Sequence, residues 1–110
     1  MAGKMTKIDV MQNYLKQLSK LKVKEFNAAD FGAIVDGLGA ANYNLDASLI
    51  AASDPMELEG LYTRFVADEL KMSDKVAGMK LVKKVALKMK TEKRKYRAVF
   101  YYLLKKESGK

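Results

Sequence analysis

The chain has 110 residues, with 21 Lys and Arg against 13 Asp and Glu, and a formal net charge of +8. It contains no Cys and no His, which excludes disulfides, thiolate zinc sites, imidazole metal ligands and Ser-His-Asp triads. Its length fits one domain, and its 49% hydrophobic content is enough for a core. We therefore expect a single domain over 1–110 that carries no metal or cofactor and is not an enzyme.

Apolar residues recur at helical spacing through most of the chain. Thr6 can cap a first helix and Asn27 a second one, because both side chains can accept a backbone N–H. Gly37 and Gly39 can end the second helix, since Gly adopts the left-handed conformation at little cost. The expected buried stripes are Ile8, Met11, Leu15, Leu18 and Leu21 in the first helix, and Phe31, Ile34, Val35 and Leu38 in the second.

The clearest helix start lies at Asp54-Pro55-Met56-Glu57. Asp54 is a good N-cap, Pro55 suits the first helical position, and Glu57 can reach back as in a capping box. The spacing predicts a helix from here to about Leu70. Its inward residues are expected to be Leu58, Leu61, Tyr62, Phe65 and Val66.

Three weaker start signals complete the pattern. Asp46 can begin a short helical turn, Ser73 can cap a helix to about Met89, and Thr91 can cap a last helix to about residue 106. These helices are predicted to bury Met79, Val82, Val85, Ala86 and Met89, and then Tyr96, Val99, Phe100, Leu103 and Leu104.

No segment alternates as a half-buried strand would. We predict an all-α fold, a small single-domain bundle of about five helices joined by short loops, with 1–5 and 107–110 frayed. The longest strongly apolar run, 98–104, is far shorter than the ~20 residues of a membrane-spanning helix, and the N-terminus lacks the apolar segment of a secretory signal. A soluble, cytoplasmic protein is therefore expected.

The positive charge is concentrated in one part of the chain. Residues 1–70 carry a net charge of −3, whereas 71–110 carry +11. In the helix predicted to begin at Ser73, Lys80, Lys84 and Lys88 repeat every four residues without an interleaved Glu. In the last helix, Arg97, Tyr101 and Lys105 repeat with the same spacing along one flank. The candidate anion-binding residues are Lys80, Lys83, Lys84, Lys88, Arg94, Arg97, Tyr101 and Lys105.

These residues favour a non-catalytic protein that binds a polyanion such as nucleic acid, because Lys and Arg neutralise phosphates and Tyr can stack on a base. The alternative is a protein–protein interaction module that docks an acidic partner. The same face could also bind anionic lipid. It could equally be a solvated surface, partly paired with acidic residues of the helix that begins at Asp54. Core packing does not account for Arg97 or Tyr101, so these two are the best candidates for a binding role. The oligomeric state is open between a monomer and a weak oligomer.

Asn42, Asn44 and Asp46 have the spacing with which an EF-hand loop begins. The likeness ends there, because Ala47 replaces the required Gly and Ser53 the required Glu. A turn held by Asn and Asp side chains is expected instead. No phosphate-binding glycine loop and no convincing pair of carboxylates is present.

Two sequence blocks resemble a family of small bacterial proteins of unknown function. One is Gly37-Leu-Gly39 followed by YNLDASLIAASD over 43–54, and the other is KYRAVFYYLL over 95–104. The resemblance implies a bacterial, cytoplasmic protein. It brings no catalytic residue, cofactor or partner with it.

Overall fold

Helices make up the fold in the computed structural model, which describes residues 6–109. Within this range no strand forms, and one isolated antiparallel bridge joins Leu49 to Tyr96. The prediction of an all-α bundle is confirmed, while fraying at 1–5 and at Lys110 concerns residues outside the described range. The elements are α1 (Lys7–Lys20), α2 (Ala28–Leu38), the 3₁₀ helix η1 (Gly39–Tyr43), α3 (Pro55–Leu61), the π-helix η2 (Tyr62–Ala67), α4 (Lys75–Lys88) and α5 (Arg97–Ser108).

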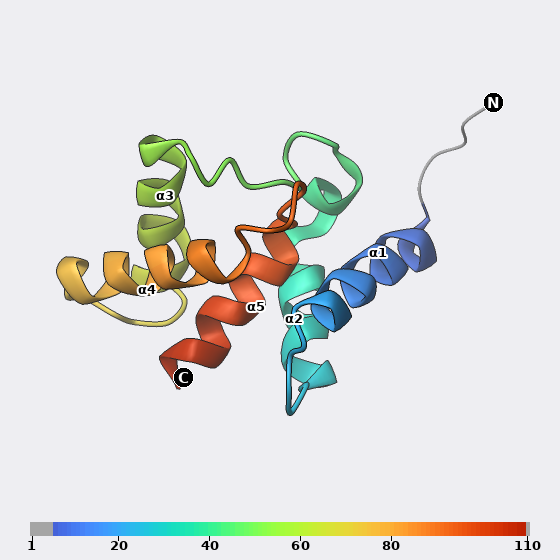
Figure 1. The fold of residues 1–110 in the computed structure, drawn as a ribbon, viewed down its shortest axis with the longest axis horizontal. Helices are drawn as coiled ribbons and strands as arrows, with labels where there is room; N and C mark the ends of the chain where they lie inside the picture. Colours follow the sequence, from blue (N-terminus) through green and yellow to red (C-terminus); the bar gives the residue numbers. More distant parts are fainter. Residues whose placement is uncertain (1–5, 110) are drawn as a thin grey trace.

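Helix α5 is the centre of the structure. It contacts α1, α2, α4 and η2, with α1 on one side of it and the pair of α3 and α4 on the other (Figure 1). A helix that is apolar around much of its circumference must be covered on several sides. The buried residues of α5 are Ala98, Val99, Phe100, Tyr102, Leu103 and Leu104.

Three of the predicted N-caps are confirmed. The side chains of Thr6, Asn27 and Asp54 each accept a hydrogen bond from a backbone N–H in the first turn of α1, α2 and α3. Pro55 occupies the start of α3, and Gly39 follows α2 with a φ of 52°. These local signals were readable because each is satisfied within a few residues of the chain.

Two other caps lie next to the residues that the sequence suggested. The cap of α4 is Asp74, whose Oδ1 accepts from two backbone N–H groups, and Ser73 precedes it. The turn expected to begin at Asp46 is instead held by Asn44, whose Oδ1 accepts from the N–H of Ala47 at 2.9 Å. In both cases a neighbouring Asp or Asn has the better position for the same type of hydrogen bond.

The last helix begins at Arg97, so the prediction that Thr91 caps it is wrong. The buried side chain of Gln17 binds the intervening segment, donating to the Arg94 carbonyl and accepting from the Tyr96 N–H at 3.2 Å. Backbone groups that a helix would have used are thus satisfied by a residue of α1, about 80 positions away in the chain.

The segment 48–50 crosses the start of α5 and pairs with it. The N–H of Ile50 donates to the Lys95 carbonyl at 2.8 Å, and the N–H of Arg97 donates to the Ser48 carbonyl at 2.7 Å. Because Tyr96 gives α5 no side-chain cap, this pairing satisfies the first N–H of the helix.

The predicted buried stripe of α1 is only partly right. Leu18 is buried, but Ile8 is 69% exposed and Leu15 is 44% exposed. The helix instead turns Tyr14 and Gln17 into the core. Both are amphipathic residues whose polar tips find partners there, so their burial costs little.

Tyr14 shows how this is achieved. Its hydroxyl donates to Asn42 Oδ1 at 2.8 Å, and Asn42 in turn donates to the carbonyls of Val35 and Gly39 at 2.8 and 2.9 Å. Burial raises the pKa of the Tyr14 phenol to about 12. The neutral phenol therefore joins α1 to the end of α2 at all physiological pH values.

Candidate functional site

The eight candidate residues have different surroundings in the fold. Three of them lie on α5, and each contacts a different element. Arg97 pairs with α3, Tyr101 stacks on η2, and Lys105 pairs with α2. This flank of α5 is therefore a line of contacts between helices.

Arg97 is engaged inside the protein. Its Nε donates to the Ala47 carbonyl at 2.8 Å, and its Nη2 donates to Glu57 Oε1 at 2.8 Å and to the Leu49 carbonyl at 3.3 Å. Burial works to lower the pKa of Arg97, but interactions with Tyr101 and Glu57 outweigh it and raise the pKa above its ordinary value. Glu57, expected to close a capping box, serves this ion pair, and Arg97 joins the 47–49 segment to α3.

The lysines of α4 divide into two groups. Lys84 and Lys88 both pair with Glu107 of α5, with a Lys84–Glu107 distance of 3.0 Å. Glu107 and Ser108 belong to the helix, where a frayed end had been expected. Lys80 and Lys83 are exposed, and within residues 6–109 neither has an ion-pair partner.

The two lysines should make stability depend on pH through Glu107. Hydrogen bonds from Lys88 and Lys84 lower the pKa of Glu107. Because the folded-state pKa lies below the unfolded one, the pair stabilises the fold above the unfolded value and loses this effect as pH falls through the folded value. We expect Glu107→Gln to cost about 0.5–1 kcal/mol at pH 7 and much less at pH 3.

Urea unfolding of both proteins at the two pH values measures this difference. Glu59→Gln is the matched control, since its pair with Lys75 is exposed on both sides. An equal cost of Glu107→Gln at pH 7 and pH 3 would contradict the assignment.

A first basic hollow lies between α1 and the loop that precedes α5. Its volume is about 470 Å³, and Glu92 is the one acidic residue among those that line it. Tyr96 and Gln17 lie on its wall. The cations that line it are Lys16 and Lys20 of α1 and Lys93 and Arg94 of the loop.

A second basic hollow, of about 360 Å³, is lined by the segment that follows α1 together with residues of α4 and α5. Glu107 is the one acidic residue in its lining. Lys20 lines the first hollow and Leu21 the second, so the two flank the same end of the helix. The cations of this second hollow are Lys22, Lys24, Lys88 and Lys106.

We call these eight cations the basic surface; two acidic residues accompany them. Only Lys88 and Arg94 among them were candidates from the sequence. The four lysines of 16–24 were missed because the first 70 residues have a net negative charge. Their spacing was the available signal, since Lys16 and Lys20 lie one turn apart on the polar side of α1.

Neither a metal site nor a membrane span is found in residues 6–109. No three Asp and Glu side chains gather there as a metal would require, and none of the helices is long and apolar enough to cross a bilayer.

A family model described as "Protein of unknown function (DUF2853)" matches residues 13–110. The chain belongs to the DUF2853 family. The match confirms the resemblance to a family of unknown function and includes the whole basic surface. No curated protein matches the chain. The DUF2853 description names no activity.

Proposed function

We propose that this DUF2853 protein binds a polyanion, specifically nucleic acid, through the basic surface around the end of α1. The observation that carries the proposal is the lining of the two adjoining hollows, where eight cations meet only two acidic residues. The cations come from α1, the segment after it, α4, the loop before α5, and α5 itself. A folded surface therefore gathers charges that lie far apart in the sequence.

Phosphate recognition fits this arrangement physically. When Lys and Arg side chains neutralise phosphates, the counterions condensed on the nucleic acid are released, which favours binding at low salt. Tyr96 is half-buried on the wall of the first hollow, and an aromatic ring beside cations can stack on a base whatever its sequence. We therefore expect nucleic acid to be bound without strong sequence preference.

The test compares two charge-matched variants. One carries Lys16→Gln, Lys20→Gln, Lys93→Gln and Arg94→Gln in the first hollow. The other carries Lys71→Gln, Lys75→Gln, Lys80→Gln and Lys83→Gln, all of them exposed and outside both hollows. We expect the first variant to lose at least about tenfold in affinity for a fluorescently labelled oligonucleotide and the second clearly less, because contact charges outweigh distant ones.

Salt provides the second readout. With four phosphate contacts to a single strand, raising the salt from ~50 to ~200 mM should weaken binding by about 50-fold. No binding at the lower salt would refute the proposal. A larger loss in the second variant would place the interface on the side of Lys71, Lys75, Lys80 and Lys83 instead. Binding of polyglutamate but not of oligonucleotide would favour an acidic protein partner.

A further inference from the structure

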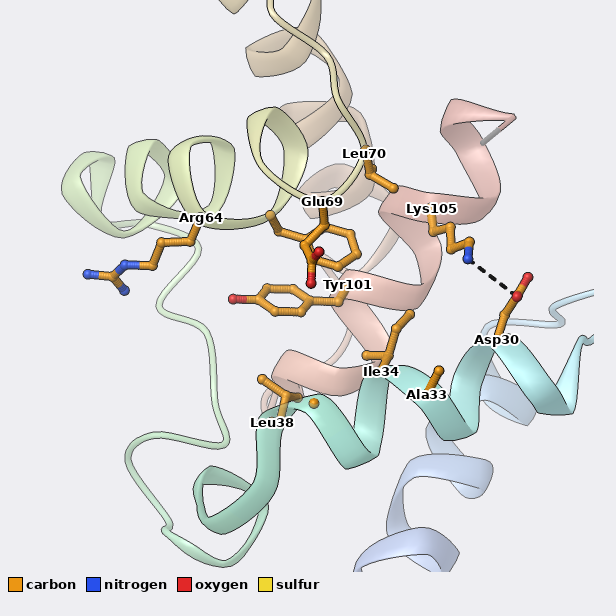
Figure 2. Close-up of a pocket in the computed structure, with 11 residues that line it drawn as sticks. Asp30, Ala33, Ile34, Leu38, Arg64, Glu69, Leu70, Tyr101 and Lys105 are labelled. Carbon is orange, nitrogen blue, oxygen red and sulfur yellow. Dashed lines mark hydrogen bonds and ion pairs between the residues drawn. The ribbon is translucent and has the colours of Figure 1, made fainter.

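A cleft of about 310 Å³ opens between α2, α5 and η2 (Figure 2). An aromatic stack forms part of its lining, with the rings of Phe65 and Tyr101 4.3 Å apart between centroids and inclined by 20°. Tyr101 is half-buried. The remaining apolar lining consists of Ala33, Ile34, Leu38 and Leu70, together with Gly37.

The π-helix η2 shapes this cleft. It supplies both Arg64 and Phe65 to the lining, and the N–H of Leu70 still reaches back five residues to the Phe65 carbonyl at 3.0 Å. Lys71 follows with a φ of 59°, which is unfavourable for a residue other than Gly. π-helical turns are rare and are found frequently at functional sites, so the backbone gives a second, independent indication of a site here.

The charges around the cleft are not equivalent. Asp30 and Lys105 satisfy each other at 3.3 Å at one end. Arg64 points away from the cleft, whereas the Glu69 carboxylate points toward it (Figure 2). Within residues 6–109 the Glu69 side chain has no ion-pair or hydrogen-bond partner. In this part of the chain, the unpaired charge that faces the aromatic stack is therefore the negative charge of Glu69.

We propose that the cleft binds a small organic cation, an ammonium group carried on an apolar or aromatic body. The Glu69 carboxylate pairs with the ammonium, and the aromatic stack of Tyr101 and Phe65 joins the apolar lining that takes the body of the ligand. This site is separate from the basic surface and selects the opposite charge, so it does not rest on the proposed function.

Three probes of nearly the same shape test the proposal: phenethylammonium, phenylacetate and the neutral 2-phenylethanol. In ¹⁵N NMR titrations of the full chain, we expect phenethylammonium to shift the amide signals of residues 33–38, 69 and 101. Because the Glu69 carboxylate attracts the ammonium and repels the carboxylate of phenylacetate, phenethylammonium should bind about fivefold more tightly than phenylacetate. The net charge of +8 would attract the carboxylate non-specifically, so the predicted preference opposes that background.

Two variants locate the site. Glu69→Gln should remove the preference for the cation. Gly37→Leu should weaken binding, because Gly37 lines the cleft and a Leu side chain there would compete with the ligand for space. An added Cβ at this position meets nothing within 4 Å, so the backbone accepts the change. Gly32→Leu is the matched control, being on the same helix, equally open and outside the cleft. Circular dichroism verifies the fold of each variant.

The proposal is overturned if phenylacetate binds as tightly as phenethylammonium. It is also overturned if no amide of the cleft shifts at ~10 mM probe, a concentration that nearly saturates a site with a Kd of about 1 mM. It is equally overturned if Gly37→Leu and Gly32→Leu bind phenethylammonium alike.

Discussion

Replacing Arg97 with Met is expected to lower the free energy of unfolding by about 2–4 kcal/mol. The change keeps most of the side-chain volume but removes every donor. Two carbonyls, of Ala47 and Leu49, lose their partner, and Glu57 is left as a carboxylate that is only 24% exposed. Breaking a largely buried pair on one side costs more than the pair contributes.

Urea denaturation followed by circular dichroism measures the effect of Arg97→Met. Arg97→Lys should recover less than half of the loss, because a single ammonium cannot reproduce the forked guanidinium geometry. Lys105→Met is the control, since its pair with Asp30 is more exposed and should contribute under 1 kcal/mol. If Arg97→Met and Lys105→Met cost the same, Arg97 does not hold the 47–49 segment as described.

Gly78→Ala should destabilise the protein by about 2 kcal/mol, although Ala normally favours a helix over Gly. An added Cβ would lie 2.5 Å from Tyr62 Cδ1, nearer still to Cε1, and 3.2 Å from Val66 Cγ1. Tyr62 cannot readily move, because its hydroxyl donates to the Met72 and Ser73 carbonyls at 3.2 Å each. The overpacking therefore outweighs the gain in helix propensity.

Gly32→Ala gives the matched comparison by thermal or urea unfolding. Gly32 lies inside α2, and an added Cβ there meets nothing within 4 Å. We expect it to stabilise the protein by about 0.5–1 kcal/mol. A stabilising Gly78→Ala would mean that α4 does not approach η2 as closely as the structure has it.

The elements that were predictable from the sequence depend on local chemistry. The caps at Thr6, Asn27 and Asp54 satisfy N–H groups within three residues, so the residue types alone identify them. The start of α5 was not predictable in this way. It depends on Gln17, which binds the segment before the helix, and on the Ser48 carbonyl, which accepts from the N–H of Arg97 at the first position of the helix. Both bonds bring together distant parts of the chain.

The same distinction applies to the candidate site. The excess of positive charge after residue 70 is a property of composition, but which cations are free is a property of packing. Arg97 and Tyr101 were the favoured binding residues, and the structure uses both to join helices. The lysines around the end of α1 face the loop before α5 only once the helices have packed, so no charge count along the chain reveals them.

NMR mapping of an oligonucleotide on the chain shows whether the basic surface binds nucleic acid. A short single-stranded oligonucleotide is titrated into the ¹⁵N-labelled chain at low salt. We expect the amide signals of Lys16, Lys20, Lys93 and Arg94 to shift together and added salt to reverse the shifts. Shifts confined to Lys80 and Lys83, or no salt-reversible shift anywhere, would contradict it.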